Sequence, residues 1–235
     1  MIGGLLGAEL IKLKRSMAVV LAILGPVGVV SMEAVNFLLR YDYLTKQYEG
    51  RLWQGLLENV SGFAPVVFLQ GSALLASLVA GSEHRTHAWK QLLALPVTRF
   101  AVFLTKFLAC GGLLLLSSIL LAAGTYLLGG LLGFGWQPPV MELLRASFHP
   151  TLAGAAVVAL QLWLSVILRN QAIPLTVGVA GTLIGMFYFK LPEWVIWKWV
   201  NLPESGALRY IFFGLVSSLG LLAAGAVHFS RRDVG

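Results

Sequence analysis

Several uninterrupted apolar stretches, each long enough to cross a bilayer as a helix, constrain this chain more than any other feature. A helix of about 20 apolar residues spans the ~30 Å hydrocarbon core of a membrane. Only 11% of the residues are charged, which is too few to cover a water-facing surface. The sequence therefore predicts an all-α membrane protein with a single transmembrane domain, residues 1–235. The six predicted spans are residues 17–39, 61–80, 101–132, 151–168, 173–189 and 208–229.

The third apolar run is longer than a bilayer requires, since residues 101–132 would extend ~48 Å as one helix. We expect it to break, either at Gly124 or at the pair Gly129 and Gly130. The polar residues 40–59 are predicted to form a loop, and residues 140–149 a short amphipathic piece before the fourth span.

The N-terminal residues 5–16 are predicted to form an amphipathic helix, with Leu6, Leu10 and Leu13 on one face. No clear small-x-small cleavage site follows the first apolar run, so we interpret that run as an uncleaved first span. On its residues alone, the helix is an interfacial one whose cations meet anionic lipid. Its charged residues are Glu9, Lys12, Lys14 and Arg15.

Lysine and arginine are distributed unevenly between the two sets of helix ends. The set that includes both termini carries ten basic and three acidic residues, whereas the other carries seven of each. Because Lys and Arg concentrate on the cytoplasmic side of a membrane, both termini are predicted to face the cytoplasm. This topology accounts for the net charge of +7, and we expect no nucleic-acid partner.

The segment between the second and third spans, residues 81–100, is the most informative one. Glu83 to Leu95 can form a short helix that Pro96 ends. At three- and four-residue spacing, one face of this helix carries Trp89, Leu92 and Leu93. Two interpretations remain open, which are a membrane-surface helix that caps two spans and a docking helix for a cytoplasmic partner.

The order of these elements resembles the permease subunits of ABC-2-type exporters, in the branch associated with bacitracin resistance and lantibiotic immunity. The more specific part of the resemblance is an acidic residue, a short helix, a leucine–x–proline ending and a lysine at the start of the third span. The matching residues are Glu83, Thr86, Trp89, Lys90, Gln91, Leu92, Leu93, Leu95, Pro96, Arg99 and Lys106.

The resemblance implies a non-enzymatic subunit in the plasma membrane of a bacterium, which exports or extracts an amphiphilic substrate such as a peptide antibiotic. ATP and Mg²⁺ would bind two copies of a separate ATPase subunit, because this chain has no Gly-x-x-x-x-Gly-Lys-Ser/Thr loop. A second copy of the chain or a related permease would complete the transporter. The residues implied in coupling to the ATPase are Glu83, Arg85, Thr86, Trp89, Lys90, Leu93, Pro96 and Arg99.

Three tryptophans lie close together between the fifth and sixth spans, at Trp194, Trp197 and Trp199. Because tryptophan favours the bilayer interface, they predict an interfacial helix in the outer leaflet. The resemblance adds the expectation of a short re-entrant helix near the point where substrate leaves.

Other candidate sites are weaker. His84 and His87 have no third ligand nearby, so we predict no metal site. Glu33 and Asn36 lie one helical turn apart in the first span, where polar groups are functional candidates, although an interfacial position explains them equally well. The alternative to a permease is a non-transport polytopic membrane protein, such as an assembly or sensor partner or, less favoured, an intramembrane enzyme.

Overall fold

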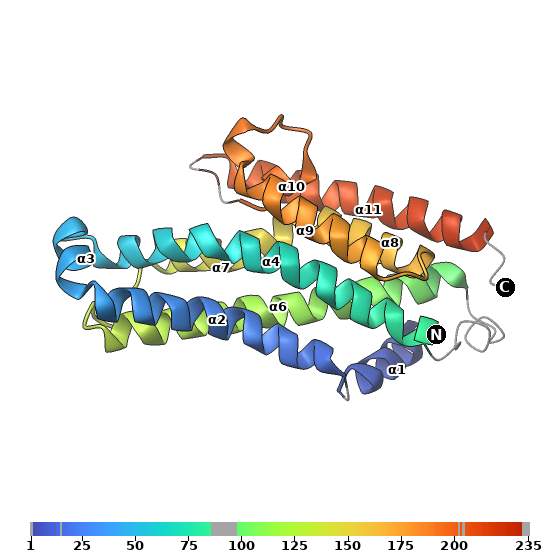
Figure 1. Ribbon diagram of the computed structural model, residues 1–235, viewed down its shortest axis with the longest axis horizontal. Coiled ribbons are helices and arrows are strands. Elements are labelled where there is room, and N and C mark those ends of the chain that lie inside the picture. Colours follow the sequence, from blue (N-terminus) through green and yellow to red (C-terminus); the bar gives the residue numbers. More distant parts are fainter. Residues whose placement is uncertain (1, 15, 86–97, 202, 204, 232–235) are drawn as a thin grey trace.

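The computed structural model describes the whole chain except residues 1, 15, 86–97, 202, 204 and 232–235 (Figure 1). All regular structure in the described part is helical. Five helical stretches are long and apolar enough to cross a membrane, and the prediction of an all-α membrane protein is confirmed. These stretches are Met17–Leu39, Leu52–Gly81, Arg99–Leu131, Val140–Ile167 and Ala207–Phe229.

The helices form an elongated bundle. In chain order they are α1 (Ile2–Lys14), α2 (Met17–Leu39), α3 (Tyr41–Gln47), α4 (Leu52–Arg85), α6 (Arg99–Leu131), α7 (Val140–Ala153), α8 (Ala155–Ile167), α9 (Ala172–Met186), η1 (Tyr188–Lys190), α10 (Ile196–Trp199) and α11 (Ala207–Arg231). Helix α1 and the last turn of α11 lie at one end of the bundle, which we call the terminal end (Figure 1). Helix α3 lies at the opposite, distal end.

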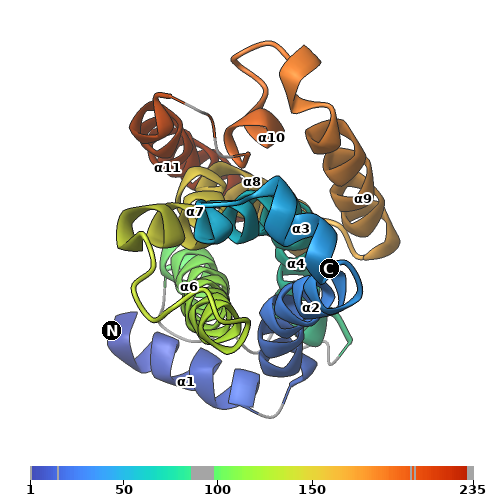
Figure 2. The same cartoon turned by 90° about the vertical axis from the view of Figure 1, so that its left-hand side faces the viewer.

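Seen along the bundle, α2, α4, α6 and α7 surround a common axis (Figure 2). Helix α8 continues from α7 toward the terminal end and packs against α4 and α11, while α9 lies to one side against α4. Helix α1 is not parallel to the others but crosses the terminal end beside α6. This crossing brings residues from the start of the chain against the ends of two spans.

The first span begins and packs as its sequence dictates. Ser16 caps α2, since its Oγ accepts a hydrogen bond from the Ala18 amide at 3.2 Å. The buried residues of α2 recur every three or four positions and form one stripe toward the bundle. These residues are Ala18, Ala22, Pro26, Val29, Glu33 and Phe37.

The predicted break in the third span is wrong, because α6 runs unbroken for 33 residues. Its glycines allow close packing instead. A Cβ atom at Gly124 would lie 2.8 Å from a Val30 methyl group, and one at Gly129 would lie 2.2 Å from the Trp53 ring. Small residues let membrane helices approach closely, and an unbroken helix keeps every backbone polar group satisfied in lipid.

The predicted loop at residues 40–59 is also largely helical, because α3 fills its first half and α4 begins at Leu52. The amphipathic piece and the fourth span form one stretch, which bends at Gly154. The ladder continues through this bend, since the Gly154 amide donates to the Pro150 carbonyl at 2.9 Å and the Val158 amide to the Gly154 carbonyl at 3.1 Å. Helix α9, where the fifth span was predicted, is apolar but has only 15 residues and is shorter than the five long stretches.

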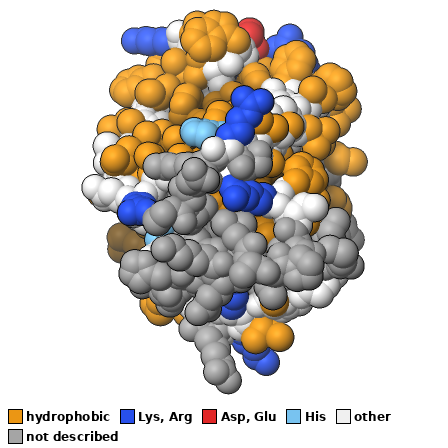
Figure 3. Space-filling view, turned by 90° about the vertical axis from the view of Figure 1, so that its right-hand side faces the viewer, with side chains coloured by type: hydrophobic (Ala, Val, Ile, Leu, Met, Phe, Trp, Pro, Cys, Tyr) orange, Lys and Arg blue, Asp and Glu red, His pale blue; other side chains and the backbone are white. Residues whose placement is uncertain are grey.

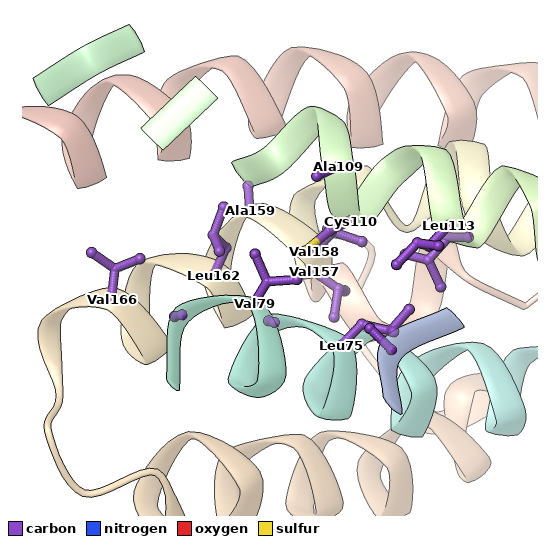
Figure 4. Packing of buried hydrophobic residues seen from close by; sticks show 14 of the residues in the cluster. Leu75, Val79, Ala109, Cys110, Leu113, Val157, Val158, Ala159, Leu162 and Val166 are labelled. Atoms are coloured by element: carbon purple, nitrogen blue, oxygen red, sulfur yellow. The ribbon is translucent and has the colours of Figure 1, made fainter. Parts of the chain in front are cut away.

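The core toward the terminal end is built around α8. Figure 4 shows Val157 and Leu162 of α8 lying between Val79 of α4 and Cys110 of α6. All four side chains are buried, and this packing fixes the ends of α4 and α6 side by side. The arrangement positions the charged residues described next.

Candidate functional site

The terminal end of the bundle contains a lysine with no exposed surface. Thr98 caps α6, and Lys106 follows two turns later on its buried face, with a side-chain exposure of 0%. Its Nζ lies 2.8 Å from Glu83 Oε1 and 3.2 Å from Glu9 Oε1. It also donates a hydrogen bond to the Val79 carbonyl at 3.2 Å. The three donors of the ammonium group thus have three acceptors, which a buried charge requires.

A second lysine extends this contact toward the surface. Lys12 Nζ lies 3.1 Å from Glu83 Oε1 and 3.4 Å from Glu9 Oε1, and its side chain is 45% exposed. Glu9 and Glu83 are themselves buried, so two carboxylates and two ammonium groups balance one another inside the protein. We call Glu9, Lys12, Glu83 and Lys106 the buried ion cluster.

Opposite charges within the cluster favour the ionised forms of Glu83 and Lys12. Burial opposes ionisation of Glu83, but the ammonium groups of Lys106 and Lys12 outweigh it and hold the pKa of Glu83 below its ordinary 4.5. Partial burial of Lys12 opposes its charge, but the carboxylates of Glu9 and Glu83 outweigh it and raise the pKa of Lys12 above 10.5. Both directions favour the charged forms of Glu83 and Lys12 around neutral pH.

The buried ion cluster joins three elements at one point. Glu9 and Lys12 come from α1, Glu83 from the last turn of α4, and Lys106 from the third turn of α6. A buried ion pair is weak evidence for added stability, because desolvation offsets much of the attraction, but it does fix the register of the elements it joins. Here it ties the N-terminal helix to both helices that border residues 86–97.

Two further contacts hold the borders of that segment. His84 Nε2 lies 3.1 Å from the carbonyl oxygens of Ser165 and Val166, near the end of α8. On the other side, Arg99 Nη1 donates to the Phe229 carbonyl at 2.9 Å, near the end of α11. The helices that border residues 86–97 therefore contact α8 and α11 as well as α1.

The sequence-predicted coupling residues fall into three groups. Glu83 and Arg99 are in place at the terminal end, but the Glu83 carboxylate is buried and faces the bundle rather than the solvent. Arg85 belongs to the last turn of α4, and its side chain is not described. The predictions that lie outside the described residues are Thr86, Trp89, Lys90, Leu93 and Pro96.

The N-terminal helix is present, with bounds of Ile2–Lys14 rather than 5–16. Its predicted apolar face is partly wrong, because Leu10 is 52% exposed while Glu9 is buried. Lys14 is exposed, and Arg15 lies outside the described residues. The buried face of α1 carries Glu9 and Leu13, and Glu9 contacts Lys106 there.

Sequence reasoning treated Lys106 only as a match to a family pattern and missed its part in a cluster with Glu9. The available signal was its position, because a lysine seven residues into an apolar helix needs a buried acidic partner. Two acidic residues at the same end of the bundle, Glu9 and Glu83, were candidates. Their pairing depends on α1 crossing the bundle, which the sequence does not reveal.

The tryptophan segment lies against α9 and α11, part of the way along the bundle (Figure 1), and forms only a four-residue helix, α10, so the predicted interfacial helix is shorter than expected. Trp194 is 77% exposed, but Trp199 is buried and its Nε1 donates to the Glu193 carbonyl at 2.6 Å. A Cβ atom at Gly181 of α9 would lie 2.0 Å from Trp197 Nε1. The indoles of Trp197 and Trp199 therefore pack the segment against the bundle.

A second ion cluster, centred on Glu193, lies in the tryptophan segment. Glu193 accepts from Lys198 Nζ at 2.6 Å, from the Tyr210 hydroxyl at 2.8 Å and from Arg209 at 3.2 Å. The hydrogen bonds from Lys198 and Tyr210 are the main reason that the pKa of Glu193 lies below 4.5. The group is exposed, so it orders the segment rather than forming an enclosed site.

No group of three or more metal-ligating side chains occurs within the part of the chain that the structure describes. The fold and its charged end define a polytopic helical membrane protein with a coupled N-terminal helix. The family model described as ABC-2 family transporter protein matches residues 5–185. This match covers more than half of the chain, which therefore belongs to that family of ABC transporter membrane components. No curated protein and no solved structure matches the chain.

Family membership places the chain among transporter membrane components, which are not themselves catalytic and which generally work with a cytoplasmic ATPase subunit. The match runs from α1 through most of α9 and so includes the whole buried ion cluster. The multi-pass architecture fits this class, since a permease needs helices that cross the bilayer.

Proposed function

We propose that this chain is the transmembrane subunit of an ATP-driven exporter of the plasma membrane, with the terminal end in the cytoplasm. The charge distribution supports this orientation, because Lys and Arg exceed acidic residues at the helix ends near both termini. Figure 3 views the terminal end, where Lys and Arg side chains lie around the undescribed residues. A basic surface of this kind suits both anionic lipid and the docking of a cytoplasmic partner.

The observation that carries the proposal is the buried ion cluster beside residues 86–97. ATP and Mg²⁺ would be bound by the partner ATPase, and closure of its two copies would push on this segment. Because Glu83 lies in the last turn of α4 and Lys106 in the third turn of α6, the push would reach both helices and α1 together. In this mechanism Glu83 and Lys106 are positioning residues, while Trp89 and Lys90 contact the ATPase.

The complete exporter would contain two permeases. A single bundle of this size, with two clusters of buried hydrophobic residues at its centre, is too small to enclose a path for a large substrate. Exposed apolar side chains on α2, α9 and α11 face lipid or a second permease, either a copy of this chain or a related one. The substrate class we propose is an amphiphile such as a peptide antibiotic, released outward or extracted from the bilayer.

Purification of the tagged full-length chain from its native host tests this function. A P-loop ATPase should co-purify, and its activity should rise when the complex is placed in nanodiscs. Trp89→Ala should abolish co-purification, whereas Lys106→Met should retain the ATPase but lower the stimulated activity several-fold. The control is Glu49→Gln, an exposed change at the distal end.

Recovery of the folded chain without any ATPase would overturn the proposal and favour a non-transport membrane protein. Equal stimulation of the Lys106→Met complex and the parent complex would instead overturn the role of the buried ion cluster in coupling.

A further inference from the structure

The bundle contains a cavity of about 60 Å³ between α2, α4, α6 and α7, several times the ~10–15 Å³ that one water molecule needs. Pro26 of α2 lines this cavity about 14 Å from the start of that helix, close to the middle of a ~30 Å hydrocarbon layer. The cavity therefore lies at the depth of lipid chains and away from the head groups of either leaflet.

The lining of the cavity is apolar apart from four hydroxyl side chains. The apolar part comes from all four helices and includes Leu21, Phe68, Leu121 and Pro150. No charged side chain occurs among the described residues that line the cavity. A charged head group would find no counter-ion there, so burial in this cavity would cost it a large free energy.

The partly exposed hydroxyl groups of the lining are already bonded within the protein. Ser117 donates to the Ala22 carbonyl at 2.6 Å. Thr151 and Ser118 bond to each other at 2.8 Å, and Ser118 donates to the Leu114 carbonyl at 3.2 Å. The protons of these hydroxyl groups are therefore directed at protein acceptors and not into the cavity.

The fourth hydroxyl group, that of Ser147, is enclosed by protein. Its Oγ is buried without a hydrogen-bond partner among the described residues, and the residue is only 2% exposed, so it offers the cavity almost no polar surface. A water molecule needs two to four polar partners, whereas an apolar cavity stays dry and accepts an apolar ligand. The lining therefore suits hydrocarbon, which would also restore the dispersion contacts that an empty space lacks.

The cavity reaches the contact between α2 and α4. A Cβ atom at Gly25 would lie 3.2 Å from a methyl group of Val67, so the two helices approach closely there. Because they run in opposite directions (Figure 1), Leu21 and Gly71 lie at one level, a turn closer to the terminal end. Both are half-buried lining residues, and a Cβ atom at Gly71 would meet no atom within 4 Å. Open space therefore lies beside this contact.

We propose that the acyl chain of a membrane lipid enters the bundle between Leu21 and Gly71 and ends in this cavity, beside Phe68 and Leu75. The head group stays outside, in the leaflet at the terminal end, because Leu21 is only four residues from the start of α2. An inserted chain sets the spacing of α2 and α4 at a level where no side chain fills the space. This lipid site goes beyond the proposed export function and does not depend on it.

Photolabelling of the full-length chain in nanodiscs tests the lipid site. The nanodiscs contain phosphatidylcholine with a diazirine near the terminal methyl group of one acyl chain, and mass spectrometry locates the labelled residues after irradiation. Phe68 and Leu75 are 6% and 2% exposed, so they should be labelled only when a chain enters the cavity. Leu69 and Val79 are similarly buried on α4 but do not line the cavity, and they should be labelled several-fold less.

Two glycine variants test the route of entry. Gly71→Leu fills the open space and should reduce the labelling of Phe68 and Leu75 to the level of the other buried residues. The control is Gly112→Leu, which also adds a side chain where no atom lies within 4 Å but does not border the cavity, and it should leave that labelling unchanged. Ile119 is 54% exposed on α6 and should be labelled equally in all three proteins by the surrounding lipid. Circular dichroism checks that both variants fold.

Equal labelling of the two pairs of buried residues in the parent chain would overturn the proposal. Labelling of Phe68 and Leu75 that persists in Gly71→Leu would overturn it as well. The experiment needs no ATPase subunit, so failure of the lipid site would leave the proposed export function intact. Failure to recover an ATPase would likewise leave the lipid site intact.

Discussion

The ammonium group of Lys106 meets the carboxylate of Glu83 at 2.8 Å in the interior of the terminal end, although the two residues flank a segment of polar chain. Each side chain is at most 2% exposed. The pair therefore links the last turn of α4 directly to α6, in addition to the chain that connects them. Any force on that segment acts on two helices that are already joined.

Removal of Lys106 should destabilise the chain more than removal of the whole pair. Lys106→Met leaves Glu83 and Glu9 buried with Lys12 as their remaining cation, at a cost of about 3–5 kcal/mol. Lys106→Met combined with Glu83→Gln should recover part of that loss, because less uncompensated charge stays buried. Thermal unfolding in detergent measures both variants, and strictly additive effects would contradict the coupling between them.

Acidification should weaken the cluster. The pKa of Glu83 is lowered in the folded chain, so its contribution to stability is fully present above the ordinary pKa of 4.5 and is lost as pH falls through the lower folded value. The melting temperature of the parent should therefore fall toward that of Glu83→Gln as pH decreases from 5. A constant difference between the two proteins down to pH 3 would contradict this assignment.

Alkaline pH should weaken the buried ion cluster by deprotonating Lys12. Because the pKa of Lys12 is raised above 10.5, its contribution is fully present below that value and is lost only as pH rises through the folded pKa. Lys12→Met should thus differ from the parent at pH 8, by less than Lys106→Met because Lys12 is half exposed. A larger effect for Lys12 than for Lys106 would be the opposite of what this burial predicts.

Two glycine-to-alanine changes should have opposite signs. In Gly181→Ala the new methyl group collides with the indole of Trp197, which should cost about 1–3 kcal/mol and increase hydrogen exchange in the tryptophan segment. In Gly112→Ala the methyl group meets no atom within 4 Å, and the helix should gain up to about 1 kcal/mol. Similar melting temperatures for the two variants would show that the Trp197 contact is not fixed.

Loss of Arg99 should loosen the end of the last helix. The Phe229 carbonyl is among the last four of α11 and has no acceptor role within the helix, so the Arg99 guanidinium satisfies it. Arg99→Ala should raise amide exchange in the last turn of α11 about tenfold, consistent with a charge-assisted hydrogen bond. Lys14→Ala, an exposed change at the same end, serves as the control and should leave that exchange unchanged.

Hydropathy predicted the spans whose faces lie against lipid. The first span was placed at residues 17–39 and α2 has those bounds, because lipid exposure demands apolar residues all along it. Hydropathy failed where a helix extends beyond its apolar run. Residues 52–59 were assigned to a loop, yet α4 already begins there, with Gln54 and Glu58 exposed and Leu56 and Leu57 buried on its other face.

Glycine was the second source of error. Gly124 and Gly129 were predicted to break the third span. Gly124 instead packs against Val30 of α2, and Gly129 packs against Trp53 of α4. The low helix propensity of glycine favours a break, but packing against neighbouring helices keeps α6 continuous. The pairing of Lys106 with Glu9 was inaccessible for a similar reason, since it depends on the path of α1 across the bundle.

The short helix α9 has a consequence for the surrounding lipid. Its 15 residues rise about 22 Å, roughly 8 Å less than the ~30 Å hydrocarbon layer. Trp197 and Asn201 contact Gly181 and Gly185, so the α10 segment lies beside the last two turns of α9. Such a hydrophobic mismatch thins the adjacent bilayer and lowers the distance that a polar head group must travel through hydrocarbon beside this helix.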